Sequence, residues 1–224
     1  MRADALSRIS EATLLGSLGA TAKDISFRKR QIIYSVGDTS DSIYLIKVGS
    51  IKLTVVSAEG NEAVTAILKG GELFGPETLD ITPSRRVTNA IALTSVRAAK
   101  IDRNTMMELV LGNPTICLLF MSSLIRRITL LQDEVAGNLL YNSEQRLART
   151  LLSFAQLAEA HTQQHVPSLS QQELASIIGV TRQRVNVLLK QFRTLGHIDD
   201  ARGHHVNKSL REVAGAELIT HNTQ

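Results

Sequence analysis

Three features of the chain predict an α+β fold with an N-terminal β-roll (a jelly roll), a long helix and a C-terminal winged helix-turn-helix. Short β-branched runs separated by glycine turns extend from Ile25 to Ile101, as in a small antiparallel roll. Apolar residues then recur at helical spacing from Pro114 to about Leu139. Two short helices joined by a glycine turn are predicted for residues 170–192. We therefore expect three segments, at residues 1–113, 114–139 and 140–224.

The composition is that of an ordinary globular protein. The chain has 224 residues, a formal net charge of +4 and 43% hydrophobic residues, enough for one large or two modest domains. Its single cysteine, Cys117, excludes an intrachain disulfide framework and a four-thiolate metal or iron–sulfur site. We expect no apolar run of membrane-spanning length and no signal peptide, and therefore a cytoplasmic protein with no membrane partner.

The first half of the chain is predicted to be mostly strands. An apolar stripe ended by Gly19 predicts one or two short helices in residues 1–20. The alternation in Ile51–Val55 is typical of a half-buried antiparallel strand, and turn signals separate the runs. The predicted strands are residues 31–36, 42–48, 51–57, 64–68, 89–93 and 96–101.

The long helix carries an apolar seam that predicts a two-stranded coiled coil. The seam residues follow one another at intervals of 4, 3, 4, 3 and 4: Cys117, Met121, Leu124, Ile128, Leu131 and Val135. Leu118 and Ile125 lie on a second face, which we expect to pack against the roll. A single buried helix is the alternative, but the polar groups Arg126-Arg127 and 132–134 favour a homodimer.

The C-terminal segment has strong helix-capping signals. Asn142 and Gln145 are a predicted capping pair for a helix over residues 143–159, followed by a loop at 160–168. In the helix-turn-helix, Ser170 and Glu173 form a predicted capping box, and Gly179 ends the first helix. Thr181 caps the second helix, and its predicted buried face is Val185, Leu188, Leu189 and Phe192. Residues 196–200 and 202–207 predict a hairpin wing, and a short helical turn follows from residue 210.

The exposed face of the second helix points to DNA. It carries Arg182, Gln183, Arg184, Asn186, Val187 and Lys190. Arginine, glutamine and asparagine are the side chains that make bidentate contacts with guanine and adenine edges in the major groove. Seven Lys or Arg residues stand against two acids between residues 181 and 211, as expected for phosphate binding. The alternative is a pair of core helices with a solvated basic face.

The order of these parts resembles the cyclic-AMP receptor/FNR family of bacterial transcription regulators over nearly the whole chain. The matching motifs are Gly37-Asp38, Tyr44-Leu45-Ile46, Gly49-Ser50-Ile51-Lys52-Leu53, Gly71-Glu72-Leu73-Phe74-Gly75 followed by Arg86, and the helix-turn-helix. The resemblance implies a cyclic-nucleotide-binding-like sensor roll and a homodimer on palindromic double-stranded DNA, with half-sites about one helical turn apart. It leaves room for RNA polymerase as a further partner.

The family's ligand positions are only partly kept in this roll. On the family's pattern the phosphate-binding arginine falls at Arg86, beyond the Gly75 turn. The ribose-binding glutamate falls at Pro76, beside Glu77, and the phosphate-binding serine falls at Val87. The adenine-facing pair falls at Leu131 and Gln132. Because lost polar partners cost several kcal/mol of binding, we expect that cyclic AMP is not bound in the usual way. A different small-molecule effector and no effector at all both stay open.

The same resemblance places the base-reading residues at Arg182, Gln183 and Val187, where the cyclic-AMP receptors have Arg, Glu and Arg. Arg182 suits guanine, Gln183 suits adenine rather than a cytosine amino group, and Val187 suits a thymine methyl. Ser170 and Thr181 match hydroxyls that contact phosphate, and we expect Arg184 and Lys190 to do the same. The operator should therefore be related to the family's usual site but distinct from it.

Other functional classes are less well supported by the residues. No Ser-His-Asp ordering, pair of buried acids or phosphate loop indicates an enzyme. The histidines follow residue 160, outside the roll, which argues against haem there, and no carboxylate–histidine cluster indicates a metal. A ligand-binding signalling module that acts mainly through protein contacts is the remaining alternative.

Overall fold

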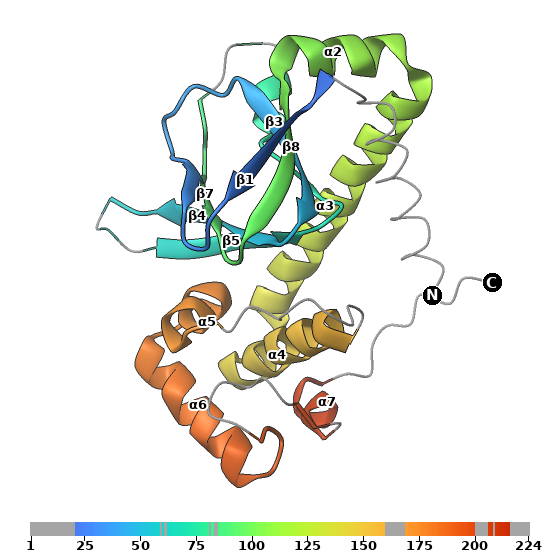
Figure 1. Ribbon diagram of the computed structural model, residues 1–224. Coiled ribbons are helices and arrows are strands. Elements are labelled where there is room, and N and C mark those ends of the chain that lie inside the picture. The colour runs from blue at the N-terminus through green and yellow to red at the C-terminus, as the bar shows by residue number, and fades with distance from the viewer. Residues whose placement is uncertain are drawn as a thin grey trace, which may run out of the picture. The chain divides into compact units, whose positions relative to one another are not determined.

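The computed structural model (Figure 1) describes residues 21–58, 60, 62–80, 82, 85–159, 169–199, 206–207 and 209–215, with the backbone alone for 156–159. The predicted helices at 1–20, the loop at 160–168 and the tip of the predicted wing lie outside these residues. The chain divides into two compact units, residues 1–130 and 131–224. The division falls within the long helix α3 (Pro114–Leu140).

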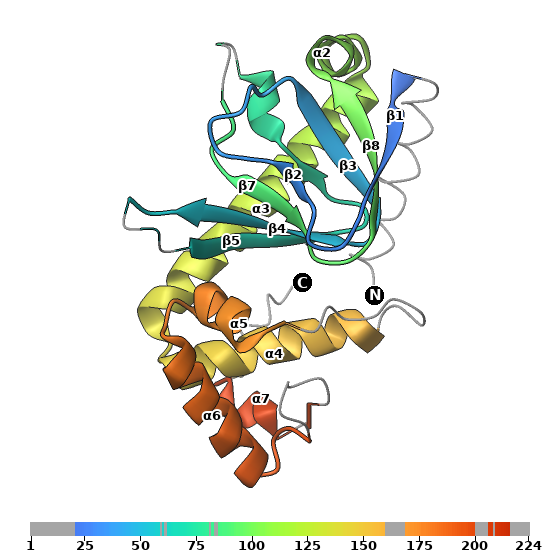
Figure 2. The ribbon, with the colours of Figure 1, turned by 60° about the vertical axis from the view of Figure 1, so that its left-hand side comes forward.

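The N-terminal unit is built on two antiparallel sheets of four strands each, visible in Figures 1 and 2. The first sheet has the order β1-β8-β3-β6 and the second the order β2-β7-β4-β5. The alternating β-branched runs thus form the predicted roll. The strands are β1 (Lys23–Phe27), β2 (Ile32–Tyr34), β3 (Ser42–Val48), β4 (Ser50–Val56), β5 (Glu62–Lys69), β6 (Leu73–Phe74), β7 (Asn89–Ala92) and β8 (Val96–Asp102).

Two buried clusters hold this unit together. The first lies between the sheets and includes Ile46, Ile51 and Phe74. The second lies on the other face of β3 and β8, where Ile43 and Ile101 pack with residues of α2 (Arg103–Gly112) and α3. Helix α2, which the sequence did not predict, is capped by Asp102, whose side chain accepts a hydrogen bond from the backbone N–H of Thr105 at 3.0 Å. Strand β3 is buried on both faces because it belongs to both clusters.

Helix α3 faces the roll with a different side from the one predicted. Ile116 and Phe120 are buried, and Leu124 packs against the second cluster. The Arg127 guanidinium also donates to the Thr65 carbonyl at 3.0 Å. Leu118 and Ile125 are 65% and 59% exposed, so the expectation that they cover the roll is wrong. Helical periodicity defines the faces of a helix, but the packing partner decides which one is buried.

The C-terminal unit consists of α4 (Ser143–Glu159), α5 (Gln171–Ile178), α6 (Arg182–Thr194) and α7 (Leu210–Val213). The Asn142–Gln145 capping pair is confirmed: each backbone N–H donates to the other residue's side-chain oxygen, at 3.1 and 2.9 Å. Arg146 donates to the carbonyls of Asn138 and Tyr141, which closes the corner between α3 and α4. An antiparallel bridge between Ile198 and Val206 confirms that the two arms of the wing pair.

Candidate nucleic-acid interface and roll pocket

The two helices of the C-terminal motif are capped as the sequence predicts. Ser170 Oγ accepts from the Glu173 backbone at 3.2 Å, and the Glu173 carboxylate accepts from the Ser170 backbone at 2.8 Å. Gly179 has a left-handed backbone, with φ of 67°. Thr181 Oγ1 then accepts from the Arg184 backbone at 3.3 Å to begin α6. Local hydrogen bonds therefore fix where both helices start and how the chain turns between them.

Helix α6 has a fully buried face and a polar exposed face. The buried face consists of Val185, Leu188, Leu189 and Phe192, as predicted, and it packs with Leu174, Ala175 and Ile178 of α5. The predicted DNA-contacting residues of α6 are all exposed: Arg182, Gln183, Arg184, Asn186, Val187 and Lys190. The helix therefore presents cationic, amide and apolar side chains together on a firmly seated surface.

Three side-chain hydrogen bonds tether this exposed face to neighbouring helices. Arg184 Nε donates to Ser143 Oγ at 3.3 Å, so only its terminal nitrogens remain to meet a phosphate. Gln191 donates to the Glu144 carboxylate at 3.1 Å. Asn186 accepts from Gln171, the first residue of α5, at 3.3 Å. Sequence reasoning missed Gln171, because nothing in the spacing indicates that it lies beside Asn186.

The two hydroxyls matched to phosphate contacts differ in what they can still donate. The Ser170 hydroxyl donates to the Glu173 carboxylate at 2.9 Å, which uses its hydrogen and places a negative charge beside it. This arrangement counts against a phosphate contact by Ser170. Thr181 uses only its acceptor lone pair in the cap, so its hydroxyl hydrogen can be directed to a phosphate oxygen.

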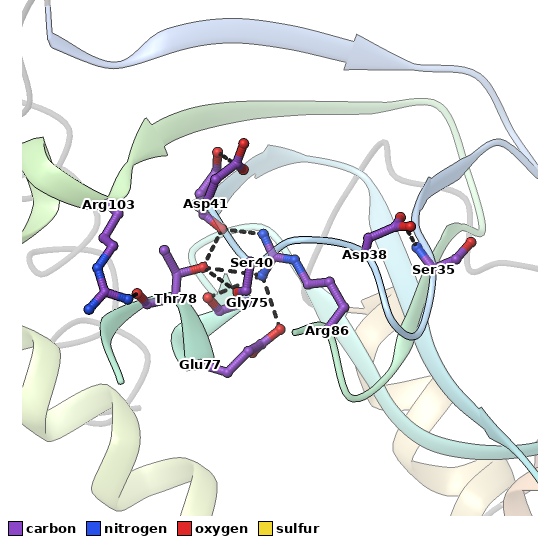
Figure 3. A network of polar contacts seen from close by, with 10 residues as sticks. Ser35, Asp38, Ser40, Asp41, Gly75, Glu77, Thr78, Arg86 and Arg103 are labelled. Atoms are coloured by element: carbon purple, nitrogen blue, oxygen red, sulfur yellow. Dashed lines mark hydrogen bonds and ion pairs between the residues drawn. The ribbon is translucent and has the colours of Figure 1, made fainter. Parts of the chain in front are cut away.

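In the roll, Arg86 lies at the centre of a buried polar network (Figure 3). Its side chain is 1% exposed. One terminal nitrogen contacts the Glu77 carboxylate at 3.0 Å, Thr78 Oγ1 at 3.3 Å and the Gly75 carbonyl at 3.4 Å. The other terminal nitrogen donates to the Ser42 carbonyl. Both ends of the guanidinium are therefore already bound by the chain itself, whereas Nε has no partner within the described part of the chain.

Aromatic rings complete the surroundings of Arg86. The guanidinium carbon lies 4.2 Å from the centre of the Tyr34 ring, and the Tyr44 and Phe74 rings stack 4.8 Å apart beside it. Burial raises the pKa of the Tyr34 and Tyr44 hydroxyls, and the Arg86 charge opposes that rise. Both tyrosines are therefore neutral near pH 7, and Glu77 is the carboxylate that pairs with Arg86.

The structure brings together only part of the predicted ligand pocket. Gly75, Glu77 and Arg86 converge, and Gly75 has a positive φ where an added Cβ would collide with the arginine. Pro76 begins the short 3-10 helix η2 (Pro76–Leu79) and is exposed, as is Val87. Leu131 and Gln132 belong to the second unit and are both exposed. Within the first unit, Arg86 thus lies with Gly75 and Glu77, whereas the side chains of Pro76 and Val87 are exposed.

Helix α3 carries an exposed apolar stripe whose register differs by one position from the predicted seam. The stripe has heptad spacing and consists of six apolar residues, Leu118, Met121, Ile125, Ile128, Val135 and Leu139, with the polar Gln132 between them. The exposed stripe and the predicted seam share Met121, Ile128 and Val135. Cys117 and Leu131 flank the stripe, with Cys117 half-buried and Leu131 39% exposed. Leu124 packs against the second core cluster of the roll and is therefore not part of the exposed stripe.

By length and composition alone, helix α3 could cross a membrane, a test that the core helix of a soluble protein also passes. Among the described residues, this helix alone is long and apolar enough, with a mean hydropathy of 1.4 over an 18-residue window that is 11% buried. Arg126 and Arg127 lie at its centre, where each charge would cost about 2.5–3.5 kcal/mol in a bilayer. The two arginines therefore count against a bilayer as the surroundings of this helix.

The described residues offer no group of three or more His, Cys, Asp or Glu side chains that could hold a metal ion. His197 pairs through Nδ1 with Ser209 Oγ at 2.9 Å and has a structural role at the base of the wing. The other histidines considered as metal ligands, at 161, 165, 204 and 205, lie outside the described residues, as do the basic residues at 202 and 208.

Comparison with known proteins agrees with both halves of this description. A cyclic nucleotide-binding domain family matches residues 24–113, and a Crp-like helix-turn-helix domain matches residues 145–214. The CRP-like cAMP-activated global transcriptional regulator of Mycobacterium tuberculosis is 25% identical over 191 residues, which cover 84% of this chain and 85% of that protein. The cAMP-activated global transcriptional regulator CRP of Salmonella typhimurium is 26% identical over 158 residues, 70% of this chain and 75% of that protein.

Solved structures share the fold. The c-di-GMP responsive global regulator CLP of Xanthomonas campestris superposes with a TM-score of 0.74 at 22% identity, covering 87% of this chain and 97% of that one. A CRP/FNR transcriptional regulator of Thermus thermophilus, TTHA1359, gives a TM-score of 0.73 at 22% identity, covering 87% of this chain and 99% of that one. The likeness extends over both compact units.

Proposed function

Because the chain belongs to the cyclic-AMP receptor/FNR family of DNA-binding transcription regulators, we propose that it acts as a homodimer that reads a palindromic DNA site with two α6 helices. It is a regulator and not an enzyme. The observation that carries the proposal is the exposed polar face of α6, seated on a fully buried apolar face. With DNA as its partner, we place the protein in the cytoplasm, where RNA polymerase would be a second partner.

The proposed contacts divide into base readers and phosphate contacts. Arg182 and Gln183 lie in the first turn of α6 and would meet guanine and adenine edges, and Asn186 and Val187 lie one turn further on. The proposed phosphate contacts are Thr181, Arg184 and Lys190. Phosphate contacts orient the helix in the groove, and base contacts select the sequence.

Dimerisation would use the exposed stripe of α3 in its observed register. Apolar residues at heptad spacing on a helix bury their surface by pairing with a second helix of the same kind. Gln132 lies within the stripe, and a single polar residue in such a seam sets the register and the number of strands at some cost in stability. This supports two parallel copies of the chain.

We further propose that the roll does not bind cyclic AMP in the family's usual way. A nucleotide phosphate would need the Arg86 guanidinium, whose terminal nitrogens are held by Glu77, Thr78, Gly75 and Ser42. Displacing Glu77 would expose its carboxylate to the incoming phosphate, and two like charges in a buried site repel strongly. An effector of this roll would therefore have to bind without taking the arginine.

Arg182 provides the direct test of DNA reading. Replacing it with alanine should weaken operator binding by about 1–3 kcal/mol and relax the preference at one base pair. Arg193→Ala is the matched control. Arg193 is exposed in the last turn of α6, and its replacement removes the same charge from the same helix. Binding to a panel of operators with single base changes, at two salt concentrations, gives both quantities. An Arg182→Ala protein with unchanged base preference would contradict the proposed contact.

A further inference from the structure

Gln171 is an amide side chain of α5 that reaches the proposed base-reading face of α6. Its Nε2 donates to Oδ1 of Asn186 at 3.3 Å, and fifteen residues separate the two along the chain. Gln171 is half-buried, whereas Asn186 is exposed. The contact therefore sits at the edge of the surface that would enter the groove, between the first turn of one helix and the second turn of the other.

The backbone positions of the two residues are fixed by packing beneath them. Ala175 and Ile178 of α5 are each 2% exposed, and Val185 and Leu189 of α6 are at most 1% exposed. The small Ala175 lets the two helices approach closely. The Ser170–Glu173 capping box also fixes the turn of α5 that carries Gln171. Since both helices are held, the hydrogen bond restrains side chains rather than backbones.

An asparagine reads adenine only when its amide is correctly oriented. It donates from Nδ2 to N7 and accepts at Oδ1 from the N6 amino group, so the reverse orientation presents donor to donor and acceptor to acceptor. A free, exposed amide can turn between the two orientations. In the structure the donor from Gln171 occupies one lone pair of Oδ1, an arrangement that suits adenine because the second lone pair and both Nδ2 hydrogens remain for a base.

We propose that Gln171 is a positioning residue for base readout, which holds the Asn186 carboxamide in the orientation that recognises adenine. The proposal rests on the proposed function, in which α6 reads the major groove. Gln171 acts through Asn186 and makes no base contact of its own. Its effect should therefore appear in the preference among bases and not in the affinity for DNA in general.

The test compares base preference among variants of the whole 224-residue chain. The position read by Asn186 is the base pair whose preference is lost in Asn186→Ala, where discrimination should fall by about 5- to 150-fold. Gln171→Ala should lower discrimination at that same base pair by roughly threefold or more, up to the loss expected for Asn186→Ala. Gln171→Lys, which can only donate, should keep the preference, and Gln171→Glu, which can only accept, should lose or reverse it. The added charges change the affinity for every operator alike, so this effect cancels in the ratio of affinities for two operators.

Controls separate this role from a structural one and from a phosphate contact. Gln172→Ala removes the neighbouring exposed glutamine and should leave the ratio unchanged. In an Asn186→Ala background, Gln171→Ala should not change the ratio of affinities between the operators any further. The unfolding midpoint of the Gln171→Ala protein should match that of the parent protein. Equal weakening on all operators with a reduced salt slope would overturn the proposal in favour of a phosphate contact. If the wild type shows no sequence preference, both the proposed function and this inference fail. If the wild type is sequence-specific and the Gln171 variants keep its base preference, only this inference fails.

Discussion

Replacing Arg86 with alanine is expected to destabilise the N-terminal unit by about 3–5 kcal/mol, because it breaks a buried ion pair and removes the donor of two carbonyls inside the roll. The Glu77 carboxylate would lose the guanidinium 3.0 Å away, and the Ser42 and Gly75 carbonyls would lose donors inside the roll. Tyr34 would lose the cation stacked on its ring. Chemical denaturation of the purified protein, followed by a spectroscopic signal of the roll, measures the change in the free energy of unfolding.

Arg85→Ala is the matched control for this experiment. Arg85 precedes Arg86 and is exposed, and its guanidinium makes a hydrogen bond to the Gly37 carbonyl at 2.8 Å. Its removal should cost no more than about 1.5 kcal/mol, the value of one such bond. If Arg86 were instead unpaired in the absence of a ligand, its replacement by alanine would increase the stability of the roll. Removing an unpaired buried charge relieves a desolvation penalty. Unchanged or increased stability of Arg86→Ala, with cyclic AMP raising the unfolding midpoint of the wild type, would contradict the proposed role.

The helix-turn-helix was predictable from sequence because its signals are local. Ser170 and Glu173 are three residues apart, and Gly179 and Thr181 terminate and begin helices by bonds to their own neighbours. The strands of the roll were predicted for a similar reason, since alternation and glycine turns are read over a few residues. In these regions the local preference and the tertiary packing agree.

The Arg86 network and the face of α3 depend on contacts between distant segments. Arg86 was identified by the family pattern, but its partners Ser42 and Tyr34 lie on strands far back in the chain, and no spacing rule connects them. On α3, two adjacent rows of apolar residues both have heptad spacing, so periodicity alone could not decide between Leu124 and Ile125. The second core cluster of the roll takes Leu124, which leaves Ile125 exposed and favours the row of residues that contains Ile125.

Replacing Ile125 with aspartate should convert the proposed dimer to monomers without unfolding the roll. Ile125 is 59% exposed within one chain, so the charge is tolerated there, but in a paired seam it would face apolar residues and another copy of itself. Loss of the second protomer removes one of two linked half-site contacts, which should weaken operator binding by about 10²- to 10⁴-fold. Light scattering coupled to gel filtration measures the mass, and titration of labelled operator measures the affinity.

Two further aspartate substitutions on the same helix separate the seam from its alternatives. Leu130→Asp is the matched control: Leu130 is also an exposed apolar residue, at 43%, on the opposite side of α3 from the stripe, so the dimer and its DNA affinity should survive. Leu124→Asp should instead lower the unfolding midpoint, because the charge would enter the second core cluster of the roll. If Leu124→Asp gave a folded monomer while Ile125→Asp stayed dimeric, the seam would lie in the register first predicted from the sequence. That outcome would mean that Leu124 leaves the roll when two chains pair, and the packing of α3 on the roll would then itself depend on dimerisation.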